Sequence, residues 1–476
     1  MEKSKSVLLL EALMSAKAER FAQVPDSLLE KERLLRSEIT SLEKELIKNT
    51  NEKEKLKSDI FLLKEQQAGL MKFVSANYPD YYSLRYGANV TDPNSFSKEL
   101  DPDELMISYF YGNQAIYALS ISQQSKNLIK IPLDKALENK IKEVHEMLSD
   151  SKSDISDLSN LTYELYGILI APLLSSPETS KLTLITDGLL SYLPFSALNT
   201  DSNGLTYLVE NYAISYANSA TLLKQLNERE PASESQMLAF APSFDGKTEV
   251  SLDRSKLLPL PHNKKEVAQI SKSFDGRSFV DKEASLDRFR SEAKGFTILH
   301  LATHAIFDDS TPEYSYLAFA QVDQPIDESI LFVADLYNLR TDVDLVTLSA
   351  CETGIGELKR GEGFLSLARG FFYSGAASIA STLWKVNDAS STQLMDSFYK
   401  NLAEGKTKDQ ALQKAKKTFI KDNSQNALAH PYYWSGFVIS GNTSPLISSN
   451  IWSWLILGIV GLSILLGLYF LKKRKS

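Results

Sequence analysis

The chain has 476 residues, of which 43% are hydrophobic and 24% are charged, and its formal net charge is −8. This length suits about two or three domains with a substantial core, which argues against a disordered chain. A single cysteine excludes a disulfide framework and a zinc site built from several cysteines. Basic residues form no block outside 472–476, so we expect no nucleic-acid partner. No cofactor or metal motif is present, and we expect neither group.

The first 76 residues are predicted to be helical. Residues 1–24 form one amphipathic helix and lack the order of charged, apolar and small residues that marks a signal peptide. Residues 25–76 repeat apolar residues at heptad spacing, with an interruption at Asn49 and Lys53. The pattern fits one long coiled-coil helix or two helices folded back as a hairpin, and the polar interruption favours the hairpin. Its simplest role is packing; the alternative is binding a coiled-coil or helical-repeat protein.

Short apolar runs predict the strands of the remaining chain. Residues 77–154 read as a connector that contains a β-hairpin, with strands at 105–111 and 115–121, and then a helix. From residue 181 onward, apolar runs alternate with helical segments, which is typical of an α/β fold with a mainly parallel sheet and helices on both faces. These runs are residues 182–186, 237–241, 296–302, 316–320, 345–349 and 376–383.

Two of these runs end in residues that can do chemistry. Cys351 follows the run 345–349, and His304 follows the run 296–302. Chemistry in open α/β sheets is placed at the carboxyl ends of strands, so two adjacent parallel strands would bring imidazole and thiol together. We interpret Cys351 as a candidate nucleophile and His304 as its general base. The plainer alternative for a lone cysteine is a small buried apolar residue.

His300 lies inside the apolar run that ends near His304. A histidine surrounded by apolar residues is more often a satisfied core residue than a catalytic one, so we assign His300 a packing role. The glycines that follow Cys351 do not form a phosphate-binding motif, because the lysine and the helix start that such a motif needs are missing.

Six motifs in chain order resemble the CHAT family, whose members are caspase-like peptidase domains related to separase and usually attached to tetratricopeptide repeats. The resemblance implies a CHAT domain at residues 155–441, with a caspase-like, mainly parallel sheet flanked by helices. It also implies that residues 1–24 are the remnant of a helical repeat. The motifs are residues 187–198, Ala302-Thr-His304, Ser349-Ala-Cys-Glu-Thr-Gly354, 361–363, Leu383-Trp-Lys-Val-Asn-Asp388 and 430–437.

The resemblance implies further site residues. The backbone N–H groups of Cys351 and Ala305 match the positions that stabilise the oxyanion, but Ala305 stands where the family commonly has glycine, so a positive φ there would be costly. Asp388 matches a residue that helps to form the acidic S1 pocket of separase, which implies cleavage after arginine or lysine. Its plainer interpretation is the N-cap of the next helix. Asp187 is a second candidate for the same pocket.

The function that the resemblance implies is a cysteine endopeptidase that cleaves a protein partner. The alternative is a catalytically silent caspase-like module that organises a signalling or membrane complex. The presence of both dyad residues, Cys351 and His304, favours the enzyme.

The C-terminal residues predict a membrane anchor. Residues 442–450 read as a linker, residues 451–471 carry no formal charge, and residues 472–476 form a basic tail. At about 1.5 Å per residue, the uncharged segment is long enough to cross a hydrocarbon layer of about 30 Å. We therefore expect a single-pass membrane protein. The basic tail favours the cytoplasmic side, but export of the preceding domain needs a signal that is not visible, so the side of the catalytic domain stays open.

Overall fold

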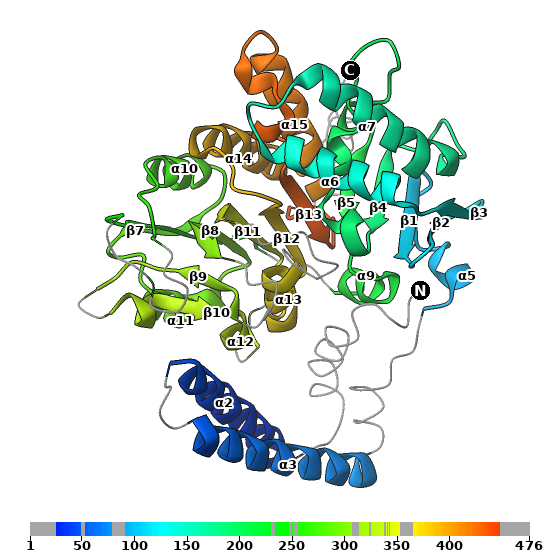
Figure 1. The fold of residues 1–476 in the computed structure, drawn as a ribbon. Coiled ribbons are helices and arrows are strands. Elements are labelled where there is room, and N and C mark those ends of the chain that lie inside the picture. The colour runs from blue at the N-terminus through cyan, green and yellow to red at the C-terminus, as the bar shows by residue number, and fades with distance from the viewer. Residues whose placement is uncertain are drawn as a thin grey trace, which may run out of the picture.

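The computed structural model forms one sheet with helices on both faces, together with a helical arm (Figure 1). The helix predicted for residues 1–24 and the membrane span and tail predicted for residues 451–476 lie outside the described residues. The described residues are 25–48, 53–78, 91–229, 234–246, 250, 256–306, 314–322, 325–337, 339, 341, 343–352 and 365–447.

The helices and strands have the following bounds. The strands are β1 (Glu104–Tyr111), β2 (Ala115–Ile121), β3 (Lys126–Pro132), β4 (Lys181–Ile185), β5 (Ala213–Tyr216), β6 (Met237–Pro242), β7 (Gly276–Asp281), β8 (Ile298–Ile306), β9 (Tyr316–Ala318), β10 (Ile330–Phe332), β11 (Leu345–Glu352), β12 (Ser378–Thr382) and β13 (Phe437–Gly441). The helices are α2 (Asp26–Lys48), α3 (Lys53–Asn77), α5 (Pro93–Phe96), α6 (Lys135–Ser149), α7 (Ile155–Leu169), α8 (Leu208–Asn211), α9 (Ala220–Asn227), α10 (Asn263–Ile270), α11 (Leu286–Glu292), α12 (Val333–Leu336), α13 (Leu365–Ser374), α14 (Asp388–Ala403) and α15 (Lys408–Asn423).

The arm consists of α2 and α3, which pack side by side (Figure 1). Leu35 of α2 and Leu70 of α3 are buried in the same apolar cluster. Lys64 of α3 forms an ion pair with Glu43 of α2 at 2.7 Å. Because early residues of α2 meet late residues of α3, the two helices run antiparallel, which is the hairpin alternative of the heptad pattern.

The arm touches the sheet domain through Arg36 of α2. The Arg36 guanidinium donates a hydrogen bond to the hydroxyl of Tyr373 and lies 5.5 Å from the centre of that ring. Tyr373 belongs to α13, the first described helix after Cys351. The arm therefore contacts an element that follows the predicted nucleophile directly in the described chain.

Among the described residues, the sheet has 13 strands in the order β10-β9-β8-β11-β12-β13-β5-β4-β1-β2-β3, and β6 and β7 branch from β8. Strands β6, β8, β11 and β12 are parallel to one another. Strands β13, β5, β4 and β1 form a second parallel group, and the pairing of β12 with β13 is antiparallel. The carboxyl ends of the two groups therefore point to opposite edges of the sheet.

Helices cover both faces of the sheet because each carries an apolar stripe that must be buried. Residues of α6, α7, α14 and α15 pack with β1 and β4 in the largest core cluster. Residues of α9, α11, α12 and α13 pack with β8 and β11 in the second cluster. The helix starts are fixed locally, since the side chains of Asp134, Asp154 and Ser219 accept backbone hydrogen bonds at the starts of α6, α7 and α9.

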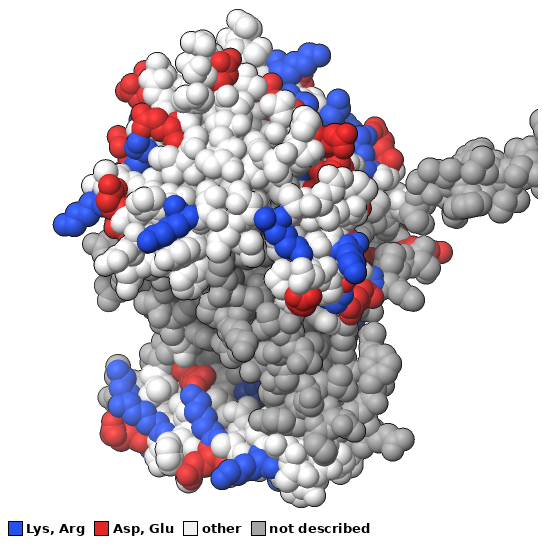
Figure 2. Space-filling model, turned by 90° about the vertical axis from the view of Figure 1, so that its right-hand side faces the viewer, with Lys and Arg blue, Asp and Glu red and all other residues white. Residues whose placement is uncertain are grey.

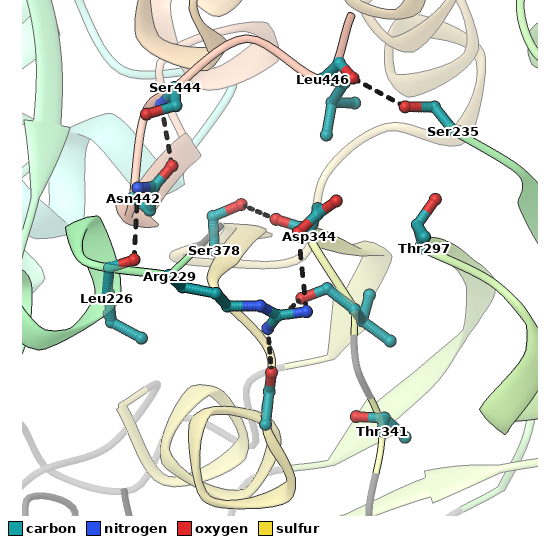
Figure 3. A network of polar contacts seen from close by, with 12 residues as sticks. Leu226, Arg229, Ser235, Thr297, Thr341, Asp344, Ser378, Asn442, Ser444 and Leu446 are labelled. Atoms are coloured by element: carbon teal, nitrogen blue, oxygen red, sulfur yellow. Dashed lines mark hydrogen bonds and ion pairs between the residues drawn. The ribbon is translucent and has the colours of Figure 1, made fainter. Parts of the chain in front are cut away.

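A polar network holds the amino ends of β11 and β12 (Figure 3). Arg229, just after α9, donates a hydrogen bond to the carbonyl of Val343 at 3.2 Å and lies 3.6 Å from the carboxylate of Asp344. It also donates to the carbonyl of Gly375, a residue with φ of 111° where a Cβ would lie 2.1 Å from the carbonyl oxygen of Thr341. Glycine is therefore required at this turn, and the start of β11 is fixed relative to α9 and α13.

The surface at the β3 end of the sheet carries charges of both signs. Figure 2 shows Lys and Arg side chains beside Asp and Glu side chains around an uncharged centre. Opposite charges at close range largely cancel one another's field at a distance, so this face presents no single-sign potential.

The predicted single-pass membrane location has to be corrected. Within the described part of the chain, no helix is both long enough and apolar enough to cross a bilayer. The segment that carried the prediction, residues 451–471, lies outside the described residues. The function proposed below therefore includes no membrane anchor.

Helix α15 buries a lysine in the core, where a hydroxyl and a backbone carbonyl accept its hydrogen bonds. The ammonium of Lys416 donates to the hydroxyl of Ser196 at 3.0 Å and to the carbonyl of Ser435 at 3.4 Å. Burial lowers the pKa of Lys416 to about 7, because removing a charge from water is costly.

Lys416 should make the free energy of unfolding rise with pH. Its unfolded pKa is about 10.4, so between pH 7 and that value the unfolded chain binds more protons than the folded one and the free energy of unfolding increases with pH. We expect Lys416→Met to remove this rise, while Lys400→Met, at an exposed position of α14, should keep it. Urea unfolding from pH 6.5 to 9 measures both, and parallel curves for wild type and Lys416→Met would contradict the assignment.

Candidate active site

The site is built on the parallel pairing of β8 with β11. Residues 298–305 of β8 and residues 345–349 of β11 are buried, as expected for central strands covered on both faces. The register runs regularly from Ile298 opposite Leu345 to Ala302 opposite Ser349, and resumes with Ala305 opposite Cys351. The backbone of Cys351 therefore lies beside the residue that follows His304, and neighbouring strands are about 4.8 Å apart.

The register contains a β-bulge at His304. Between the paired positions there are two residues on β8, Thr303 and His304, but one residue on β11, Ala350. An extra residue of this kind bends the strand and changes the direction of nearby side chains, and bulges are frequent beside active sites. The side chain of Cys351 is not among those that the structure describes.

The imidazole of His304 is buried and held in one tautomer. Its Nε2 lies 2.7 Å from the carbonyl oxygen of Leu258, and its ring packs 4.8 Å from the ring of Phe244. Because a carbonyl oxygen only accepts hydrogen bonds, Nε2 must carry the hydrogen. In the neutral ring, Nδ1 then has the lone pair that can take a proton, as a general base requires. The sequence analysis did not identify Leu258 or Phe244.

Asp388 lies close to His304 although 84 positions separate them in sequence. The N-cap of α14 is Asn387, whose side chain accepts from the backbone N–H of Ser390 at 3.1 Å, so the N-cap interpretation of Asp388 is corrected by one residue. Asp388 instead accepts a hydrogen bond from the backbone N–H of His262 at 2.6 Å. Desolvation raises the pKa of Asp388, and the N–H of His262 and the charge of His304 act in the opposite direction.

One short segment supports both residues. Leu258, which fixes His304, and His262, which donates to Asp388, lie four residues apart just before α10. The first residue of α10, Asn263, donates to the carbonyls of Pro242 on β6 and Ala302 on β8 at 2.8 and 3.2 Å. This hydrogen bond to Ala302 therefore holds the segment against β8, the strand that carries His304.

Asp187 does not come near this edge of the sheet. It follows β4, which runs opposite to β11 because of the antiparallel pairing of β12 with β13. Its carboxylate accepts a hydrogen bond from the backbone N–H of Tyr111 at 2.8 Å. We therefore leave Asp187 out of the proposed substrate pocket and assign it to the packing of β1 against β4.

Ala305 has an ordinary strand backbone. It pairs with Cys351 of β11 and Leu317 of β9, and among the described residues Asp281 is the one non-glycine residue with a positive φ. The left-handed conformation that a glycine would permit at position 305 is therefore not used, and the alanine causes no backbone strain here.

His300 is satisfied in the core by contacts with Glu266 and Tyr399. The described residues hold no cluster of three or more His, Cys, Asp or Glu side chains that could bind a metal ion.

Two curated proteins resemble part of the chain. Mouse and human tetratricopeptide repeat protein 28 are each 25% identical to it over 337 residues, which covers 60% of this chain and 13% of each relative. The chain thus spans about an eighth of the length of these curated relatives.

Two solved structures are similar at low identity. The separase–securin complex of Saccharomyces cerevisiae aligns with 8% identity and a TM-score of 0.47 over 76% of this chain and 31% of that one. The Arg-specific cysteine proteinase gingipain R aligns with 10% identity and a TM-score of 0.38 over 66% of this chain and 76% of that one.

The CHAT domain family model matches residues 160–442, which include every strand from β4 to β13. Because this match covers more than half of the 476 residues, the chain belongs to the CHAT domain family.

Proposed function

We propose that the chain is a cysteine endopeptidase that cleaves a protein, with Cys351 as nucleophile and His304 as general base. The observation that carries the proposal is the register of β8 and β11, in which Cys351 stands opposite Ala305, the residue after His304. Membership of a family with caspase-like peptidase domains is consistent with this chemistry.

In the proposed reaction, Nδ1 of His304 takes the proton of the Cys351 thiol, and the thiolate attacks the carbonyl carbon of the scissile peptide bond. The imidazolium then gives its proton to the leaving amine, and a water molecule hydrolyses the thioester to release the acid and restore the thiol. A free cysteine has a pKa of about 8.5, so this activation is needed at neutral pH.

The carbonyl of Leu258 would support the charged intermediate. Its hydrogen bond from Nε2 of His304 at 2.7 Å becomes stronger when the ring carries a positive charge. The same bond prevents the ring from flipping, which would present the wrong nitrogen to the thiol. The negative oxygen of the tetrahedral intermediate would be bound by the backbone N–H groups of Cys351 and Ala305, and losing one such donor costs about 3–4 kcal/mol.

Asp388 is the proposed specificity residue. Its carboxylate is half-buried and lies near enough to His304 for their charges to interact. An anionic group beside the reacting bond would favour arginine or lysine at P1 through charge-assisted hydrogen bonds. Because burial raises the pKa of Asp388, this preference should disappear at a higher pH than for an ordinary aspartate as the pH falls.

A helical partner is a further part of the proposal. The relatives with 25% identity are named tetratricopeptide repeat proteins, which supports a link between this type of domain and helical repeats. The arm formed by α2 and α3 leaves Leu34, Phe61 and Leu62 more than half exposed, and such side chains suit contact with another helix.

The dyad can be tested with a peptidyl-arginine coumarin amide as substrate. We expect Cys351→Ala and His304→Ala each to lower kcat/KM by roughly 10³-fold or more, and the double variant to be no worse, because residues that act as a unit lose activity non-additively. His430→Ala is the control, since the His430 imidazole contacts the hydroxyl of Ser153 at 3.0 Å. Undiminished hydrolysis by a folded His304→Ala variant would rule out the dyad.

The specificity residue can be tested with matched arginine and leucine substrates. Asp388→Asn removes the charge but keeps an oxygen that accepts from the N–H of His262, so the segment before α10 should stay in place. We expect kcat/KM for the arginine substrate to fall about 10- to 100-fold, an order expected for losing a charge-assisted contact, with little change for leucine. Asp396→Asn, elsewhere on α14, is the control. An unchanged arginine preference in Asp388→Asn would place the S1 determinant elsewhere.

A further inference from the structure

We propose that a buried hydrogen-bond chain, Glu266–His300–Tyr399–Thr347, positions the dyad by fixing β8 relative to β11. This inference rests on the proposed peptidase function and assigns four positioning residues to it. None of the four touches a reacting atom. Each acts through the strand that carries His304 or Cys351.

The chain crosses four elements of the fold. The carboxylate of Glu266 on α10 lies 2.9 Å from Nε2 of His300 on β8. Nδ1 of His300 lies 3.1 Å from the hydroxyl of Tyr399 on α14, and that hydroxyl donates to the hydroxyl oxygen of Thr347 on β11 at 2.9 Å. The exposed fraction of each of the four residues is 1% or less, so water does not compete for these bonds.

The direction of the bonds follows from the groups involved. The Tyr399 hydroxyl uses its one hydrogen on Thr347, so its oxygen must accept from Nδ1–H of His300. Burial raises the pKa of Tyr399, which keeps that hydrogen on the hydroxyl. Glu266 and Nε2 of His300 then share a proton, and the imidazole is held from both sides. The ring cannot rotate without breaking two buried bonds, each costly to lose.

The position of this hydrogen-bond chain in β8 and β11 indicates its role. His300 and Thr347 are register partners, and each lies four residues before a member of the dyad, His304 on β8 and Cys351 on β11. Between them and the dyad, the register slips at the bulge. Backbone pairing alone therefore does not fix the two ends, and cross-linking by buried side chains just before the bulge limits their relative motion.

The flanking helices extend the same support. Helix α14 also bonds β11 through the hydroxyls of Ser391 and Ser349 at 2.9 Å, and its first residue is Asp388. Helix α10, which carries Glu266, follows the segment that holds His304 through Leu258. A displacement of about 1 Å in a catalytic pair can cost 10²-fold in rate, so loss of this support should lower catalysis as well as stability.

The test uses the single cysteine of the chain. Alkylation by iodoacetamide reports on Cys351 alone, needs no substrate, and follows the thiolate fraction from pH 5 to 9.5. We expect wild type to react well below the ordinary thiol pKa of about 8.5, and His304→Ala to react like an ordinary thiol. Tyr399→Phe should shift the profile toward that of His304→Ala and slow alkylation at pH 6.5 several-fold.

Two further variants separate positioning from stability. Tyr109→Phe is the matched control, because the Tyr109 hydroxyl is equally buried and donates to the carbonyl of Leu169 at 2.7 Å. Tyr109 lies on β1, which is separated from β8 and β11 in the strand order, so this variant should lose stability without changing the alkylation profile. Thr347→Val breaks the same hydrogen-bond chain at its Thr347 end. It should shift the profile as Tyr399→Phe does, and the double variant should shift it no further.

The outcomes are distinct. In one outcome, His304→Ala shifts the pH profile of alkylation, but Tyr399→Phe keeps the wild-type profile and loses only as much stability as Tyr109→Phe. That result would overturn the positioning role of the hydrogen-bond chain and leave the dyad intact. A wild-type profile of an ordinary thiol, unaffected by His304→Ala, would overturn the dyad and the positioning chain together.

Discussion

The parallel pairing of β8 with β11 is the constraint on which the site depends. It sets Cys351 opposite Ala305 and places the histidine in a bulge, where two residues of one strand face one residue of the other. The rest of the fold holds these two strands in register. The network of Arg229 and Asp344 fixes the start of β11, and α10 and α14 hold both strands through buried side chains that lie before the bulge.

Burial explains the electrostatics of the site. His304 is fully buried, with Phe244 on its ring and the Leu258 carbonyl at Nε2, so water does not stabilise its charged form. A partly desolvated carboxylate, Asp388, lies within range and is held by the N–H of His262. Groups kept away from water interact more strongly than exposed ones.

Part of this site could be predicted from the sequence. The apolar runs at 296–302 and 345–349 correspond to β8 and β11, and the family motifs assigned His304 and Cys351 to their ends. The supporting contact of Leu258 could not be predicted, because a backbone carbonyl has no residue signature. The side chains that link the strands were also missed, since a histidine inside an apolar run carries no sign of its partners on distant helices.

Other differences have simple physical causes. Asp187, in the family motif at 187–198, was the second candidate for the substrate pocket. The reversal between β12 and β13 places it at the opposite edge, and apolar patterning does not reveal such a change of strand direction. Asparagine and aspartate are equally good N-caps, so sequence alone could not choose between Asn387 and Asp388. Short strands such as β5 and β10 are difficult to recognise because they hold too few residues to show a period.

We propose that this chain cuts proteins with Cys351. The most direct measurement compares the protein N-termini that appear when wild type or Cys351→Ala is added to the same proteome extract. The account predicts N-termini that form with wild type only and that follow arginine or lysine. Identical sets of N-termini for the two proteins, both folded, would contradict it and would favour a catalytically silent module.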